Sequence, residues 1–175
     1  MDYTQTTLIR GGTIVTGQSI AEQDLYIKGE QIEAIGGVQG LTADRVIDAA
    51  GWLVLPGAVD THVHFNDEFM NTISVHNYIT GTRAAAFGGV TSIVDFANQM
   101  PGGSLQQAFE NKKAEARGKA IIDWGVHPVI TQADKKTLAE IAGLVRQGAP
   151  TFKCYLTYRQ EGLMVEDHDL KKILD

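Results

Sequence analysis

The feature that most constrains this chain is a regular alternation of strand-like and helix-like segments over residues 53 to 175. Strand-like segments rich in apolar and β-branched residues alternate with segments whose apolar residues recur at helical spacing. This order predicts parallel strands joined by crossover helices, because a parallel connection needs a long segment that returns along the sheet. The expected strands are 53–64, 90–96, 120–130 and 151–156, and the expected helices are 75–87, 104–117, 134–147 and 167–175.

Four strand–helix units make up half of a (β/α)8 barrel, so the fold class predicted is α/β, with the N-terminal part of a TIM barrel. A doubly wound sheet of four or five strands fits the same pattern, and the pattern does not separate the two. The dinucleotide-binding version of that sheet lacks support. Gly88-Gly89 precedes a strand, whereas the phosphate-binding fingerprint follows one.

Residues 1–52 have a different pattern, that of a small β module. Residues 25–27 and 31–35 form two short strand patterns, and Lys28-Gly29-Glu30 between them has the length and composition of a hairpin turn. Further strand patterns lie at 8–10, 13–15 and 45–48. The module is too small to bury a substantial core alone. We therefore expect two domains, a β module over 1–52 and a barrel half over 53–175.

Charge and composition limit the classes of partner and the location that we expect for this protein. The net charge of -6 disfavours nucleic acid and anionic membrane surfaces. No apolar run approaches the roughly 20 residues that a spanning helix needs, and residues 1–7 lack the apolar centre of a signal peptide. Cys154 is the only cysteine, so an intramolecular disulfide is excluded. The expected location is cytoplasmic.

The run Asp60-Thr61-His62-Val63-His64 is the strongest local signal for chemistry. Alternate residues of a strand share a face, so His62 and His64 would point the same way. Two imidazoles at the end of a parallel barrel strand can bind one metal ion, and active sites of barrels form at that end. A chance pair of surface histidines is the alternative, and the apolar segment that leads into the motif favours the metal.

Lys153 is the second signal, because a lysine in the middle of an expected barrel strand is unusual. Phe152, Cys154 and Leu156 would face the helices, which leaves Lys153 and Tyr155 facing the interior. Burial lowers the pKa of a lysine, and a neutral amine can react with carbon dioxide to give a carbamate that bridges two metal ions. From the residues alone, a lysine that reaches solvent or pairs with an acid is the simpler interpretation.

Several longer motifs resemble one family. Residues 56–65 (PGAVDTHVHF) resemble the amidohydrolase signature, and residues 81–96 and 116–127 resemble hydantoinases and dihydropyrimidinases. Residues 152–158 are similar to the bridging-lysine segment of that family. The similarity extends from about Leu8 to the last residue. The chain thus resembles the N-terminal portion of the dihydropyrimidinase/D-hydantoinase family of cyclic amidohydrolases.

The resemblance implies a metal-dependent hydrolase with a small composite β sandwich before a truncated barrel half. It implies that His62 and His64 bind one metal ion and that carboxylated Lys153 bridges two divalent ions, with zinc expected. Tyr158 would stabilise the oxyanion. The substrate would be a small cyclic amide of the hydantoin or dihydropyrimidine type, opened to an N-carbamoyl amino acid. A homo-oligomer is expected, since the family forms tetramers.

The resemblance also implies ligands that this sequence does not contain. The family places its remaining metal-binding histidines and the aspartate that acts as general base further along the chain than Asp175, so we expect residues 1–175 alone to be inactive. Phe65-Asn66 is similar to allantoinases, which stay an alternative, as does a non-catalytic assembly protein of the same fold. Asn66 stands where dihydroorotases carry arginine, which argues against that activity.

Overall fold

The computed structural model describes residues 4–175 of the chain. Its contacts divide the chain into two compact units, Met1–Pro56 and Gly57–Asp175. No helix within residues 4–175 is long and apolar enough to cross a membrane.

The first unit is a single sheet built around the long strand β1 (Thr6–Val15). β1 pairs antiparallel with β2 (Ile20–Lys28), which forms the expected hairpin with β3 (Gln31–Ile35). β4 (Arg45–Asp48) and the short β5 (Leu53–Val54) pair with β1 in parallel. The two strand patterns expected at 8–10 and 13–15 belong to one strand with a bulge, where Gly11 takes a left-handed backbone with φ 69°.

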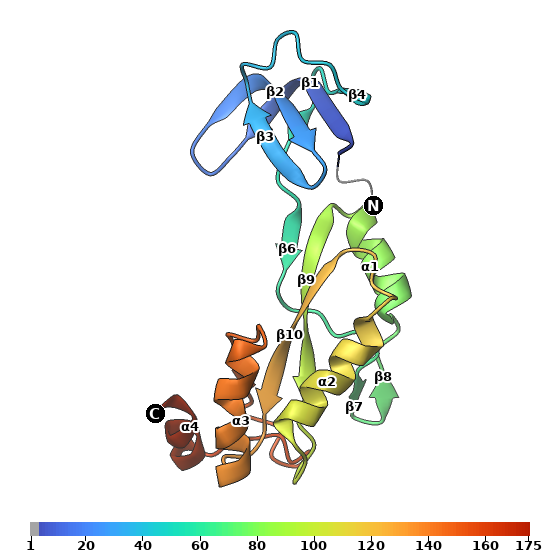
Figure 1. Cartoon of the computed structure of the whole chain (residues 1–175). Helices are drawn as coiled ribbons and strands as arrows, with labels where there is room; N and C mark the ends of the chain where they lie inside the picture. The colour runs from blue at the N-terminus through green and yellow to red at the C-terminus, as the bar shows by residue number, and fades with distance from the viewer. Residues whose placement is uncertain (1–3) are drawn as a thin grey trace. The chain divides into compact units, whose positions relative to one another are not determined.

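The second unit contains a curled, four-stranded parallel sheet in the order β11-β10-β9-β6 (Figure 1). Its strands are β6 (Ala58–Asp60), β9 (Val90–Asn98), β10 (Asp123–Ile130) and β11 (Lys153–Cys154). Neighbours in this sheet follow one another in the chain, so the order has no switch point of the kind that defines doubly wound sheets. The expected α/β alternation with parallel strands is confirmed.

Four helices connect or follow these strands: α1 (Tyr78–Phe87), α2 (Leu105–Ala116), α3 (Lys135–Arg146) and α4 (Asp167–Leu174). Side-chain caps start three of them. The side chains of Asn77, Ser104 and Asp134 accept hydrogen bonds from backbone N–H groups in the first turns of α1, α2 and α3. The starts predicted for the second and third helices at Ser104 and Asp134 are thereby confirmed as cap positions.

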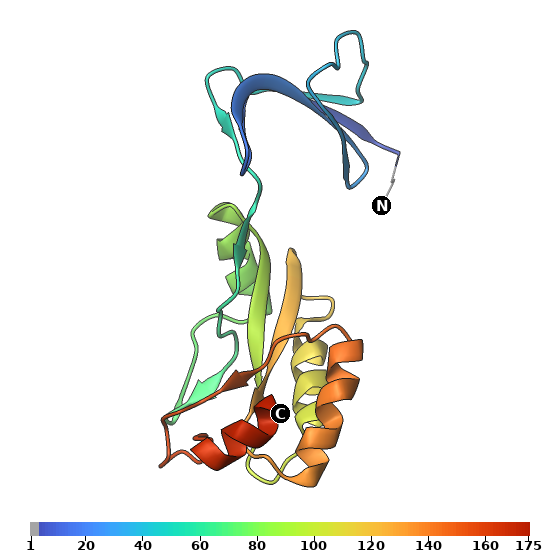
Figure 2. The same ribbon diagram turned by 90° about the vertical axis from the view of Figure 1, so that its left-hand side faces the viewer.

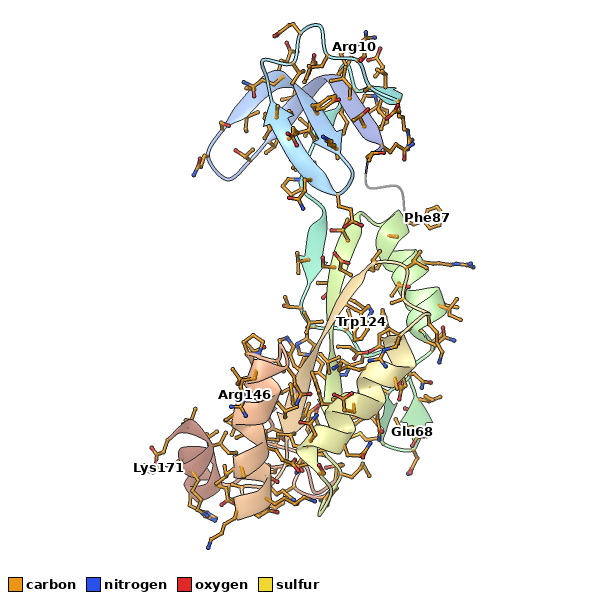
Figure 3. The ribbon with its side chains drawn as sticks, in the orientation of Figure 1. Arg10, Glu68, Phe87, Trp124, Arg146 and Lys171 are labelled. Carbon is orange, nitrogen blue, oxygen red and sulfur yellow. The ribbon has the colours of Figure 1, made fainter. Side chains whose placement is uncertain are left out.

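The helices pack on one face of the sheet, where α2 and α3 lie side by side (Figure 2). Ala97 of β9 and Val126 of β10 join Leu105, Phe109 and Leu144 in one buried cluster. A second cluster gathers Ile93 with residues of α1 and α2, and Trp124 packs against both (Figure 3). Because side chains alternate along a strand, the residues between these positions face the other side of the sheet.

Two predicted strands are shorter than expected. β6 ends at Asp60 rather than His64; beyond it the Asp60 side chain accepts the His62 N–H (3.1 Å), and the Val63 N–H still donates to the Val94 carbonyl of β9 (3.2 Å). β11 covers only Lys153–Cys154 instead of 151–156, since its partner β10 ends at Ile130. Leu156, expected to face the helices, is 62% exposed, whereas Phe152 and Cys154 do pack against the first buried cluster.

The sequence did not predict the small hairpin of β7 (Glu68–Phe69) and β8 (Thr72–Ile73), which follows β6. Its turn residues Met70 and Asn71 both have left-handed φ values, 50° and 60°. Asparagine adopts this conformation readily, so Asn71 was the one available turn signal.

Gly81 of α1 gives a direct test of the packing. A Cβ built at Gly81 would lie 2.4 Å from the buried Phe65 ring, whereas one at Gly143 of α3 would meet nothing within 4 Å. We expect Gly81→Ala to lower the free energy of unfolding by about 1–3 kcal/mol through overpacking. Gly143→Ala should raise it by about 0.5–1 kcal/mol, as for glycine in a helix interior. Urea titration of both variants measures this, and a stabilising Gly81→Ala would contradict the packing.

Candidate metal centre

Three of the residues singled out in the sequence surround the ring of Phe96, on the face of the sheet opposite the helices. The His62 and His64 rings lie 4.6 Å and 4.9 Å from the Phe96 ring, centroid to centroid, and 5.2 Å from each other. Lys153 Nζ lies 4.1 Å from the centroid of the same ring. The two histidines therefore lie side by side as predicted, although they follow the strand rather than belong to it.

Lys153 has an unusual environment for a lysine. Its Nζ also lies 4.5 Å from the Tyr155 ring centroid, and among residues 4–175 it has no hydrogen bond or ion pair. Desolvation lowers the pKa of Lys153, and the Asp67 carboxylate opposes that shift. The pKa of His62 is also lowered, first by desolvation and then by the Lys153 charge. Both effects favour neutral nitrogens with free lone pairs.

These residues open onto one cavity of about 400 Å³. Tyr158, the fourth residue singled out in the sequence, lines it together with the three around Phe96. Tyr158 takes a left-handed backbone with φ 63° and contacts the rings of Tyr155 and Phe69 edge-on. The full lining is His62, His64, Asp67, Phe69, Thr72, Ile73, Ser74, Lys153, Tyr155 and Tyr158.

Asp67 is a cavity residue that the sequence analysis missed. Its Oδ2 atom lies 2.8 Å from His64 Nδ1, and its Oδ1 atom accepts a hydrogen bond from Asn98 Nδ2 at 2.9 Å. The only sequence signal was the spacing of three residues from His64. That spacing has no meaning outside a helix, so the contact depends on how the loop folds back against the end of β9.

The residues around Phe96 offer few donor atoms for a divalent ion. Within residues 4–175, no group of three or more His, Cys, Asp or Glu side chains has the geometry to hold a metal. Two imidazoles are present, and the third nearby nitrogen belongs to Lys153. An ammonium group has no lone pair, so Lys153 fits a metal only as a neutral amine or, with two oxygens, as a carbamate. His62, His64 and Lys153 therefore fit the expected metal ions when Lys153 is a neutral amine or a carbamate.

A buried ion pair on the helix side of the sheet binds the backbone of the segment that carries the histidines. Lys112 Nζ lies 3.4 Å from Asp95 Oδ2, and the two side chains are 7% and 0% exposed. The Phe65 N–H donates to Asp95 Oδ2 (3.3 Å), and Lys112 Nζ donates to the Phe65 carbonyl (2.6 Å). Burial raises the pKa of Asp95, while Lys112 and backbone N–H groups work against the rise. Phe65 directly follows His64, so this pair fixes the histidine backbone.

The other histidines lie away from one another. His127 contacts Thr151 Oγ1 (2.5 Å), His76 contacts Thr80 Oγ1 (3.3 Å), and His168 lies beside Asp169 on α4. His127 also packs near the Phe96 ring, with 5.3 Å between centroids. Burial raises the pKa of the Cys154 thiol, which favours an unreactive thiol.

No family model matches the chain. It is similar to the D-hydantoinase of Ralstonia pickettii, with 41% identity over 96% of this chain and 36% of the relative. It is 35% identical to the dihydropyrimidinase of Dictyostelium discoideum, over 99% of this chain and 35% of the relative. The crystal structure of dihydropyrimidinase from Brevibacillus agri covers 97% of this chain and 37% of its own, with a TM-score of 0.93 and 40% identity.

The mixed α/β fold with its parallel sheet and the similarity over nearly the whole chain both agree with these relatives. The chain belongs to the dihydropyrimidinase/D-hydantoinase family of cyclic amidohydrolases. It spans about a third of the length of the curated relatives it matches.

The buried pair predicts a large difference between two neighbouring lysines. Lys112→Met leaves Asp95 buried without its cation, which is expected to lower the free energy of unfolding by about 3–5 kcal/mol. Lys113→Met removes a partly exposed contact with Glu110 and should cost less than about 1 kcal/mol. Adding Asp95→Asn to Lys112→Met should recover part of the loss. Equal effects of the two lysine variants in urea unfolding would contradict the role of the pair.

Proposed function

We propose that the intact protein opens the ring of a small cyclic amide of the hydantoin or dihydropyrimidine type, giving an N-carbamoyl amino acid. One observation carries the proposal: His62, His64 and Lys153 gather around Phe96 and open, with Tyr158, onto one cavity. Relatives named D-hydantoinase and dihydropyrimidinase support this reaction class. Allantoinase-type hydrolysis of a related cyclic ureide is the alternative substrate choice.

In this proposal, His62 and His64 would hold one divalent ion, and Lys153, as a carbamate, would supply oxygen ligands shared with a second ion, with zinc as the expected metal. The carbamate forms when the neutral Lys153 amine adds to carbon dioxide, making an N–C bond and releasing a proton from nitrogen. The lowered pKa of Lys153 supports this step because only the neutral amine is nucleophilic. When bound, the metal ions would activate water for attack and polarise the ring carbonyl.

The chain's own cavity residues would orient the ring. The Tyr158 hydroxyl would donate a hydrogen bond to the carbonyl oxygen as negative charge develops on it. Phe69 and Ile73, from the hairpin over the cavity, supply apolar surface for a ring substituent. The remaining step needs a group that accepts the proton of the attacking water as a general base and then donates it to the leaving nitrogen, and we assign that role to no residue of this chain.

We further propose the larger assembly that this activity needs. The parallel sheet of Gly57–Asp175 would be the first half of a (β/α)8 barrel, with residues 1–52 as part of a separate β sandwich. Strand order without a switch point supports the barrel. A cytoplasmic homo-oligomer is the expected state of the intact protein, and by itself the segment 1–175 is expected to be inactive.

The metal assignment is tested on the intact protein by metal analysis and mass spectrometry. We expect His62→Ala/His64→Ala to lose bound zinc and ring opening of hydantoin and dihydrouracil. Lys153→Ala should lose the bridging group, and short carboxylates such as acetate should restore part of its activity. His76→Ala is the matched control, because His76 lies outside the cavity lining, and it should keep both zinc and activity. Unchanged zinc content in the double histidine variant would refute the assignment.

Tyr158→Phe tests the oxyanion donor separately from the metal. The variant removes one hydroxyl and keeps the ring contacts with Tyr155 and Phe69. We expect kcat to fall by roughly 100-fold or more, as for other single oxyanion donors, with zinc content intact. Tyr155→Phe, which removes a hydroxyl from the neighbouring cavity residue, serves as the control. A wild-type kcat for Tyr158→Phe would exclude Tyr158 from the mechanism.

A further inference from the structure

Asp67 holds the ring of His64 through a fully engaged carboxylate. Asp67 Oδ2 lies 2.8 Å from His64 Nδ1, and Asp67 Oδ1 accepts a hydrogen bond from Asn98 Nδ2 at 2.9 Å. The backbone N–H of Asp67 donates to Ser74 Oγ (2.9 Å), and its side chain is 16% exposed. With both oxygens and the backbone engaged, the carboxylate is fixed relative to the cavity.

This arrangement links three segments that are separate in the chain. Asn98 is the last residue of β9, Ser74 follows the hairpin of β7 and β8, and His64 follows β6. Asn66 takes a left-handed backbone with φ 50°, which turns the chain so that Asp67 faces back toward His64. The contact between Asp67 and His64 therefore depends on the turn at Asn66 and on hydrogen bonds that join Asp67 to Asn98 and Ser74.

The hydrogen bond decides which imidazole nitrogen is free. An ionised carboxylate only accepts hydrogen bonds, so His64 Nδ1 must carry the proton when it contacts Asp67. In the neutral ring, His64 Nε2 then presents its lone pair, which is the state a metal-binding imidazole requires. Partners of this kind orient metal-binding histidines, and their loss commonly costs 10–100-fold in metal affinity.

We propose that Asp67 is a positioning residue that fixes His64 as an Nε2 metal ligand, with Asn98 holding the carboxylate in place. This inference rests on the proposed function, because it assigns His64 to a metal. It adds a residue to the site beyond the two histidines, Lys153 and Tyr158. Asp67 itself does not bind the metal in this account and does not contact the reacting atoms.

The test compares zinc affinity, measured by competition with a chelator, in variants of the intact protein. Asp67→Asn keeps the size of the side chain but replaces the charged acceptor of His64 Nδ1 by a neutral amide, and it should weaken zinc binding by about 10–100-fold. Glu68→Gln removes the same charge at the next position, where the side chain lines a different cavity, and should leave the affinity unchanged. Asn98→Ala should weaken binding by a smaller factor, because the carboxylate loses one of its two partners.

A second readout reports the tautomer without metal. Nitrogen NMR of histidine-labelled, metal-free protein should show His64 protonated on Nδ1, and Asp67→Asn should shift that proton toward Nε2. Wild-type zinc affinity in both Asp67→Asn and Asn98→Ala would overturn the inference, as would an Nε2-protonated His64 in the unaltered protein. If Asp67→Asn does not fold, Asn98→Ala decides by the same criterion.

His64→Ala separates this inference from the proposed function. If His64→Ala loses zinc while Asp67→Asn and Asn98→Ala bind it normally, Asp67 has no positioning role and the metal centre stands. If His64→Ala itself binds zinc normally, the proposed metal centre fails and the inference fails with it.

Discussion

The buried contact between Asp95 and Lys112 is the interaction on which the candidate site depends. The pair holds both backbone groups of Phe65, the residue that directly follows His64. The Phe65 ring is held as well, since it packs edge-on against Tyr78 and against the backbone of Gly81, which has no side chain to displace it. The segment that follows β6 is therefore fixed by side chains of β9, α1 and α2, in addition to the hydrogen bond from the Val63 N–H to the Val94 carbonyl (3.2 Å).

Because side chains alternate along β9, one face of this strand carries packing residues and the other contacts the candidate metal ligands. Asp95 faces the helices and is engaged in the buried pair, whereas its neighbour Phe96 faces the opposite side of the sheet and contacts both histidines and Lys153. Two adjacent residues thus connect the packed face of the sheet with the face that carries the candidate metal ligands. A substitution on the helix face can affect the candidate site through Phe65. The backbone of Phe65 is hydrogen-bonded to Asp95 and Lys112, and the residue before it in the chain is His64.

Much of this architecture could be predicted from the sequence because it depends on periodicity. The strand–helix order, the caps at Ser104 and Asp134, and the hairpin at Lys28-Gly29-Glu30 are local signals, and the structure confirms them. The pairing of His62 with His64 was predicted from strand alternation and holds even though the strand ends at Asp60. The roles of Asp67 and Lys112 could not be predicted, since each depends on contacts with residues far away in the sequence. Lys112 in particular lies on a helix of polar composition, where a lysine is normally exposed.

The central claim is that His62, His64 and Lys153 form one metal centre, and anomalous X-ray diffraction from zinc-loaded crystals of the intact protein tests it most directly. The account predicts anomalous peaks within bonding distance of His62 Nε2, His64 Nε2 and a carboxyl group attached to Lys153 Nζ. Zinc peaks elsewhere, or an unmodified Lys153 directed away from the peaks, would contradict it.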